Sequence, residues 1–264
     1  PAVLVVGADA PKGVPVLPPL ASVKRDVSEG ALRRCHQDQE DPTPKPCHFG
    51  DANARTHIVL AGDSHALQWL PALIRVAEAR GWRLTSYTKS ACVFADVEIT
   101  KPDGTSYENC AAWRKKVIKR IKRLHPAVVL TSQSRLYADM TADSEKTKAV
   151  VEGLLQVWGK LERGGTKVIA IRDTPSMEFN PPDCVAEQRD ECRRSRAETE
   201  KHVDPIVIAA ERSQTRTIDM TDAICGPEWC ESIVGNVFVW RDSNHLTATY
   251  ARLAAPYLAE RAGL

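Results

Sequence analysis

From residue 57 onward, short apolar runs alternate with longer segments in which apolar residues recur about every 3.6 positions. The short runs predict buried strands over residues 57–62, 82–88, 127–131, 167–171 and 215–219. The longer segments predict helices over residues 66–80, 108–124, 144–163, 194–212 and 247–262, with Pro205 kinking or restarting its helix. This alternation predicts right-handed crossovers and a parallel sheet with helices on both faces. Ligands bind such sheets at the carboxyl ends of the strands, so candidate chemistry is sought there.

The segment before residue 57 lacks this regular pattern. Eight of the 17 prolines fall before position 47, and proline breaks helices and cannot donate to a sheet ladder. We expect mostly irregular structure there, with one short helix near residues 26–34. The sequence therefore predicts a Pro-rich linker or extension over residues 1–56 that packs on the core, and an α/β domain over residues 57–264.

The composition is that of an ordinary globular chain of 264 residues, with 43% hydrophobic and 27% charged residues. The net charge is +2, from 36 Lys and Arg against 34 Asp and Glu, which argues against a dedicated nucleic-acid binder. No apolar run approaches the ~20 residues that span a bilayer, and no signal peptide opens the chain. Since the sequence starts at Pro1 rather than Met, we expect a processed or excised piece.

Eight cysteines are the most informative feature of the composition. No two of them have the C-x-x-C spacing of a zinc or redox site. Pairing of sequence neighbours gives four local disulfides, Cys35–Cys47, Cys92–Cys110, Cys184–Cys192 and Cys225–Cys230, although other pairings are formally open. Disulfides persist outside the reducing cytosol, so we expect an extracytoplasmic domain. The alternative is a cytosolic protein with eight buried free thiols.

Two short motifs place reactive residues next to predicted elements. Gly62-Asp63-Ser64-His65 follows the first strand, where the Ser64 hydroxyl can face the crevice and its N–H lies at a helix start. Asp242-Ser-Asn-His245 precedes the last helix, and an Asp can there fix the tautomer of a His three residues later. Taken alone, each motif is also explained by helix capping.

Together the two motifs resemble the terminal signatures of the SGNH (GDSL-like) hydrolase family, over about residues 57–264. The resemblance implies a flavodoxin-like three-layer α/β sandwich with a central parallel sheet. It also implies a triad in which Ser64 is the nucleophile, His245 the general base and Asp242 the orienting acid. It implies no cofactor and no metal. The Gly-x-Ser-x-Gly elbow of α/β-hydrolases does not surround Ser64.

The two middle signatures of the family, which complete its oxyanion hole, differ here. The family's glycine is missing after the second strand, where the N–H of Ser90 or Ala91 is the candidate donor. The family's Gly-x-Asn-Asp is replaced after the third strand by Thr131-Ser-Gln-Ser-Arg135, which makes Gln133, Ser134 and Arg135 candidates near the site. One lost donor typically costs ~3–4 kcal/mol of transition-state stabilisation.

These departures, with Lys89-Ser90-x-Cys92 and Asp-x-Asn-His-Leu246, resemble one branch of the family. That branch is the SGNH domain fused behind the integral-membrane acyltransferase-3 domain in bacterial surface-glycan O-acyltransferases. The resemblance implies an extracytoplasmic domain, on the periplasmic side of the cytoplasmic membrane and tethered by a membrane domain that this chain lacks. That membrane domain would be the acyl source, and residues 1–56 resemble the linker to it.

The leading hypothesis is therefore a serine O-acyltransferase, of the O-acetyl type, that modifies a cell-envelope glycan. The acceptor stays open among peptidoglycan, arabinogalactan, lipopolysaccharide and a glycolipid sugar. The alternatives are a secreted carbohydrate esterase and a non-catalytic glycan-binding module. Near the site, His65 and Trp240 are further candidates to line the pocket. We expect no nucleic-acid partner and a monomer.

Overall fold

The computed structural model describes residues 13–101, 103–189 and 191–264. A seven-stranded sheet forms its centre, built from β1 (His36–Gln37), β2 (Cys47–Gly50), β3 (His57–Gly62), β4 (Arg83–Lys89), β5 (Val128–Ser132), β6 (Lys167–Ile171) and β8 (Arg216–Ile218). The strand order is β1-β4-β3-β5-β6-β8, and every pair along it is parallel. Only β2 runs antiparallel, along the outer edge of β4.

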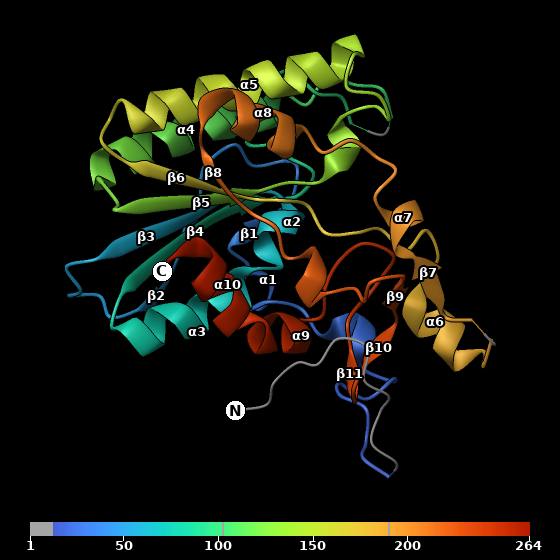
Figure 1. Cartoon of the computed structure of the whole chain (residues 1–264). Helices are drawn as coiled ribbons and strands as arrows, with labels where there is room; N and C mark the ends of the chain where they lie inside the picture. The colour runs from blue at the N-terminus through green and yellow to red at the C-terminus, as the bar shows by residue number, and fades with distance from the viewer. Residues whose placement is uncertain (1–12, 102, 190) are drawn as a thin grey trace.

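Helices cover both faces of the sheet (Figure 1). One layer contains α4 (Glu108–Leu124), α5 (Glu145–Glu162) and α8 (Pro205–Ser213), and the other contains α3 (Leu70–Arg80), α9 (Ala248–Leu253) and α10 (Ala255–Ala262). Alternate strand residues enter the two cores: Ile58 and Leu60 face the α3 side, whereas Val59 and Ala61 face the α4 side. Burial on both faces explains the continuous apolar runs in the sequence. The predicted three-layer α/β fold is confirmed.

Three predicted helices are divided in the structure. The first becomes α2 (Ser64–Leu67) and α3, and the last becomes α9 and α10, with Pro256 in the first turn of α10. The segment predicted as a helix over residues 194–212 forms β7 (Arg193–Ser195), α7 (Arg196–Thr199) and then α8, which begins at Pro205. Proline is favoured at a helix start because its missing N–H has no partner there.

Smaller elements complete the chain. They are the 3₁₀ turns η1 (Val23–Arg25), η2 (Arg135–Tyr137) and η3 (Thr221–Ala223), the helices α1 (Glu29–Leu32) and α6 (Pro181–Ala186), and the strands β9 (Trp229–Glu231), β10 (Ile233–Val234) and β11 (Val237–Phe238). β7 pairs with β9 and β10 with β11, so two small ribbons lie beside the main sheet (Figure 1).

The segment before residue 57 is mostly irregular among the described residues, as the sequence predicts, and its helix α1 lies within the predicted short helix near residues 26–34. Its strands β1 and β2, which the sequence analysis does not predict, both pair with β4. Lys89, at the end of β4, donates through Nζ to the carbonyl oxygens of Asp38 and Asp41 and holds the intervening loop. The first twelve residues of the predicted extension lie outside the described residues. A domain division after residue 56 stays a prediction.

Four disulfides join the cysteines that are neighbours in sequence: Cys35–Cys47, Cys92–Cys110, Cys184–Cys192 and Cys225–Cys230. These are the pairs that the sequence analysis expects, and they fit an extracytoplasmic domain. Within the described ranges, no helix has the length and apolar character needed to cross a bilayer.

Candidate active site

Ser64 is the first residue of α2, in the tight turn that follows β3. The turn requires glycine at position 62, because Gly62 has a φ of 155° and an added Cβ would lie 2.1 Å from the carbonyl oxygen of Ser132. Asp63 then caps α2, since its Oδ1 accepts the N–H of His65 at 2.8 Å. Ser64 therefore lies at the carboxyl edge of the sheet.

His245 comes from the loop between β11 and α9, and Asp242 shapes that loop. The Asp242 Oδ1 accepts the backbone N–H groups of Asn244 at 3.0 Å and of His245 at 2.8 Å. Both carboxylate oxygens also lie at 2.9 and 3.0 Å from the His245 Nδ1. The short spacing between the two residues thus lets one carboxylate fold the turn and orient the ring.

A continuous hydrogen-bonded chain links Ser64, His245 and Asp242. The His245 Nε2 lies 2.9 Å from the Ser64 Oγ, although 181 positions separate the two residues in sequence. An ionised carboxylate only accepts, so the proton of a neutral His245 sits on Nδ1 and its Nε2 accepts from the Ser64 hydroxyl. In this arrangement the imidazole can take the serine proton.

The charges around His245 keep its ring neutral. Burial lowers the pKa of His245, and the positive charges of His65 and Arg241 lower it further, against the hydrogen bond to Asp242. Although burial raises the pKa of Asp242, the hydrogen bond from His245 and the nearby Arg241 hold it well below its usual range. The pair therefore contains a carboxylate and a neutral base.

A second histidine–aspartate pair lies next to the first. His65 Nδ1 is 2.5 Å from the Asp173 Oδ1, and both side chains are buried. Burial lowers the pKa of His65, but the charges of Asp173 and Asp63 outweigh it and raise the pKa to about 9. The rings of His65 and His245 are 4.6 Å apart between centroids. His65 thus places a fixed positive charge beside the neutral ring of His245.

Buried carboxylates tie together the loops that follow the strands. Asp63 accepts the N–H of Ser134 at 3.0 Å, and Asp173 accepts that of Arg135 at 2.7 Å. Asp204, at the start of α8, accepts the N–H of Asp173 at 2.8 Å. Each carboxylate thus fixes the loop of a neighbouring element, which holds the crevice edge rigid.

Two candidates from the sequence lie outside the reach of a bound ligand. Arg135 is 2% exposed and its guanidinium donates to the carbonyl oxygens of Asp173 and Thr174, so it braces the loops instead of facing the cavity. Trp240 is 0% exposed and donates through Nε1 to the carbonyl oxygen of Glu231, so it packs in the core and does not wall the pocket.

The candidate oxyanion donors differ in whether they are already hydrogen-bonded and in whether their residues line the cavity. The Ser90 N–H is already used, since it donates to the carbonyl oxygen of Gln37 in the β1–β4 pairing. Ala91 lines the cavity with a left-handed φ of 49°, and its N–H makes no hydrogen bond within the described part of the chain. The Gln133 Oε1 accepts the N–H of Phe94, and its buried Nε2 has no partner among the described residues, but Gln133 does not line the cavity.

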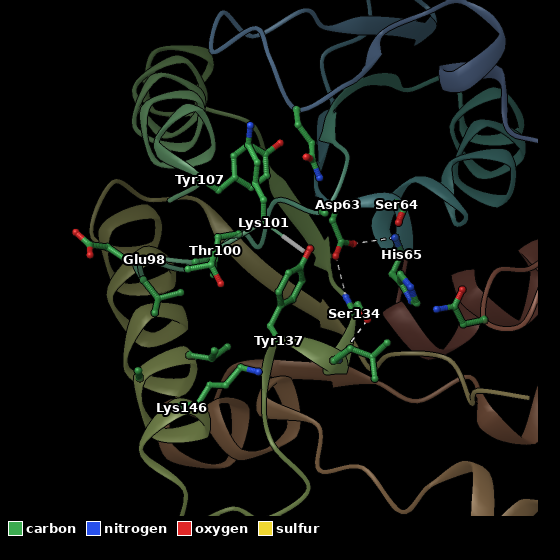
Figure 2. Close-up of a pocket in the computed structure, with 18 of the residues that line it drawn as sticks. Asp63, Ser64, His65, Glu98, Thr100, Lys101, Tyr107, Ser134, Tyr137 and Lys146 are labelled. Atoms are coloured by element: carbon green, nitrogen blue, oxygen red, sulfur yellow. Dashed lines mark hydrogen bonds between the residues drawn. The ribbon is translucent and has the colours of Figure 1, made fainter. Parts of the chain in front are cut away.

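A cavity of about 780 Å³ opens over Ser64, and Figure 2 shows its walls. Asp63, Ser64 and His65 lie along one side, opposite Lys101 and Tyr107, and the ring of Tyr137 lies between them with its hydroxyl toward Asp63. Sequence reasoning missed the residues of that far wall, which also include Glu98, Thr100 and Lys146. They come from loops and helix starts that carry no motif, so only the fold brings them to the site.

The cavity holds no evident metal centre, since no group of three or more His, Cys, Asp or Glu side chains among the described residues is placed to bind an ion. Its polar groups are instead hydroxyls, amides and isolated charges. Such a lining suits an organic ligand with several hydroxyl groups.

Comparison with known proteins places this geometry in context. A family model described as "SGNH domain (fused to AT3 domains)" matches residues 34–260. The periplasmic domain of a lipopolysaccharide acetyltransferase from Salmonella ser. Paratyphi A superposes with a TM-score of 0.68 and 16% identity, over 94% of this chain and 98% of that one. At this identity the likeness shows the fold alone.

Two other solved structures are less similar. A putative acylhydrolase from Bacteroides fragilis has a TM-score of 0.47 and 13% identity, over 80% of this chain and 88% of that one. A catalytic mutant of an acetylxylan esterase from Geobacillus stearothermophilus has a TM-score of 0.49 and 13% identity, over 82% and 96%. No curated protein matches the chain in sequence.

Proposed function

Since the chain belongs to the family of SGNH domains that are fused to AT3 domains, we propose that it is an extracytoplasmic O-acyltransferase domain that works through an acyl-enzyme on Ser64. The observation that carries the proposal is the chain of hydrogen bonds from Ser64 through His245 to Asp242 on the wall of a large cavity. The transferred group is acetyl and the acceptor is a sugar hydroxyl of a cell-envelope glycan. The acetyl group is also what the superposed Salmonella protein transfers by its name.

In the first step, the Ser64 Oγ attacks the carbonyl carbon of the acyl donor. The His245 Nε2 takes the serine proton, and Asp242 stabilises the imidazolium that forms. The bond between the carbonyl carbon and the leaving group then breaks, and the proton passes from His245 to that group. The product is an ester between the acyl group and Ser64.

In the second step, a sugar hydroxyl attacks the same carbonyl carbon. His245 takes the proton from the sugar hydroxyl, the new C–O bond forms, and the bond to the Ser64 Oγ breaks. The proton returns from His245 to the Ser64 Oγ, so the enzyme is unchanged at the end of the cycle. If water takes the place of the sugar, the same steps make the domain an esterase.

The oxyanion that forms in each step needs N–H donors at the carboxyl edge of the sheet. We assign this role to the backbone N–H groups of Ser64 and Ala91, both of which line the cavity. The left-handed φ of 49° at Ala91 is a conformation that favours glycine, the residue the family has in this signature.

The acceptor lies in the large cavity. Tyr137 offers an aromatic face for a sugar ring, while Glu98, Thr100 and Lys101 offer polar partners for its hydroxyls. The acyl group comes from the membrane acyltransferase-3 domain of the same polypeptide, to which residues 1–56 lead. The domain lies on the periplasmic side of the membrane that contains this partner domain. When it is isolated, the domain is a monomer.

Turnover of p-nitrophenyl acetate by the wild-type protein and by Ser64→Ala tests the proposal. We expect the wild type to release nitrophenol and to gain one acetyl group on Ser64 when the reaction is stopped with acid and read by peptide mass spectrometry. The Ser64→Ala variant should do neither, while its melting temperature stays within a few degrees of the wild type. Equal rates for the two proteins would rule out Ser64 as the nucleophile.

A further inference from the structure

A second, smaller cavity of about 210 Å³ reaches Ser64 from another direction. Its walls come from the N-terminal segment, through Val27, Ser28, Ala31 and His36, and from the two motifs of the active site. Within the described chain, Ser64 is the only residue that lines both this cavity and the large one. The Ser64 hydroxyl therefore stands between two separate spaces.

The small cavity has a volume of about 210 Å³ against about 780 Å³ for the large one, and half of the residues that line it are aliphatic. Aliphatic side chains form much of its surface: Val27, Ala31, Leu67, Leu246 and Ala248. Its polar side chains are almost all committed to protein partners. His36 bonds to the hydroxyls of Thr88 and Ser90 through its two ring nitrogens, Gln68 accepts the N–H of Leu246, and Arg241 pairs with Asp242.

Ser28 is the exception among these polar groups. Its side chain lines the small cavity and is 4% exposed, and its Oγ has no hydrogen-bond partner among the described residues. It precedes α1 but makes no capping bond to that helix. A buried hydroxyl of this kind needs a hydrogen-bond partner, and one water molecule is enough to supply it.

We propose that this small cavity is the acyl pocket, which holds a short acyl chain while it is esterified to Ser64. The inference rests on the proposed acyl transfer and adds where the acyl chain lies and how long it can be. A sugar does not suit the cavity, because its hydroxyls would lose water and find one free hydroxyl, that of Ser28. A methyl or ethyl group needs no polar partner and gains from the aliphatic walls.

Because the two cavities are separate, the acyl group and the acceptor sugar of the second step can occupy the site together. The acyl chain extends into the small cavity, and the acceptor sugar enters the large cavity without displacing it. The acceptor oxygen then forms its bond to the carbonyl carbon as the bond to the Ser64 Oγ breaks, with His245 moving the proton from the acceptor to the serine. A long acyl chain would exceed the volume of about 210 Å³ in the small cavity, so the pocket selects short chains.

The test compares kcat/KM for p-nitrophenyl acetate and butyrate in matched variants. Ala31→Leu narrows the small cavity, and Ala149→Leu makes the same change on the wall of the large one. We expect Ala31→Leu to lower the butyrate-to-acetate ratio about tenfold, the discrimination that one or two methylenes give in a hydrophobic pocket. Ala149→Leu should leave this ratio unchanged and reduce transfer to a sugar acceptor.

Ser28→Ala provides a change of the opposite sign. It enlarges the small cavity and removes its unpartnered hydroxyl, so the butyrate-to-acetate ratio should rise about two- to fourfold, near the effect of one buried methylene. The alanine side chain is smaller than serine and fits without rearrangement, so this variant keeps the proposal testable if Ala31→Leu does not fold. An unchanged ratio in Ser28→Ala and in a folded Ala31→Leu, or an equal shift in Ala149→Leu, would overturn the assignment.

The outcomes also separate this inference from the proposed function. If nitrophenol release does not depend on Ser64, the acyl-enzyme itself fails and the acyl pocket fails with it. If release depends on Ser64 but the variants of the small cavity keep the wild-type ratio, the acyl-enzyme stands and only the position of the acyl chain is wrong.

Discussion

Two histidine–aspartate pairs lie side by side in this molecule, and they hold opposite charge states. His65 and Asp173 are 4% and 2% exposed at their side chains and 2.5 Å apart, whereas His245 and Asp242 are 17% and 32% exposed and 2.9 Å apart. The pKa of His65 is raised to about 9, and the pKa of His245 is lowered. A histidine–aspartate contact therefore does not by itself determine whether the ring is charged.

The neighbours beyond each pair explain the difference. His65 faces Asp63 as well as Asp173, so two carboxylates outweigh the cost of burying its charge. His245 faces one carboxylate, and the positive charges of His65 and Arg241 oppose its protonation. The buried pair thus acts as a fixed structural ion pair, and it helps to keep the other histidine available as a base.

The largest effect should come from disabling the less buried pair, His245 and Asp242, through Asp242→Asn. The asparagine amide presents a donor to the His245 Nδ1, which favours the tautomer whose Nε2 carries the proton and cannot accept from Ser64. We expect kcat for p-nitrophenyl acetate to fall about 10⁴-fold, the scale of the equivalent change in a serine triad. Steady-state kinetics measures this loss.

Asp242→Glu serves as a control that keeps the negative charge but changes the geometry of the turn. The longer carboxylate keeps the charge but not the turn in which Asp242 accepts the N–H groups of Asn244 and His245. We expect intermediate activity from it. An Asp242→Asn protein with the wild-type kcat would contradict the assignment of Asp242 as the orienting acid.

The buried pair should instead contribute to stability, which Asp173→Asn tests. Its loss leaves His65 without its closest carboxylate and weakens the bond to the Arg135 N–H, so the free energy of unfolding should fall by about 3–5 kcal/mol near pH 7. Urea denaturation followed by circular dichroism gives this value. Unchanged stability at pH 7 would mean that the pair is not ionised.

The pH dependence of this difference identifies the ionised pair. A raised pKa of about 9 for His65 means that its contribution is complete below the ordinary histidine pKa and is lost as the pH rises through about 9. The pKa of Asp173 is lowered, so its contribution is lost only in acid, as the pH falls below the ordinary aspartate value. The stability difference between wild type and Asp173→Asn should therefore be largest between the ordinary pKa of aspartate and the ordinary pKa of histidine. It should shrink as the pH rises through about 9.

The contrast between the pairs also indicates what sequence can predict. Ser64, His245 and Asp242 lie in two short motifs, because a tight turn after a strand and an Asp three residues before a His are local features. The apolar runs likewise predict the core strands, since a parallel sheet buried on both faces needs continuous apolar residues. These features depend on neighbours in the sequence, so the sequence is sufficient to find them.

The features that sequence reasoning misses depend on distant contacts. Arg135 follows a strand, where a side chain can reach a ligand, but its guanidinium donates to the carbonyl oxygens of Asp173 and Thr174 in the loop after β6. Trp240 precedes the Asp242 motif, yet it turns into the core. The strands β1 and β2 are only two and four residues long and lie in a Pro-rich segment, so the sequence gives no strand pattern there. Their pairing with β4 makes them regular.

The smallest predicted effect measures the coupling between the two pairs. In His65→Gln the fixed charge beside His245 is removed, so the pKa of His245 should rise toward its ordinary value. The rate of acyl transfer falls as the pH drops through the pKa of His245, because protonation removes the base. The acidic limb of the rate profile should therefore move to higher pH by roughly one unit, the scale of one nearby charge.

Lys146→Gln is the matched control, since Lys146 is also a cation in the wall of the large cavity but its side chain is 57% exposed and pairs with Asp139. Solvent and salt screen an exposed charge, so this variant should leave the acidic limb in place. If both variants shift the limb equally, the effect follows net charge and not the contact of the two rings. If His65→Gln lowers the rate at all pH values without moving the limb, His65 contributes to folding of the site and not to the pKa of His245.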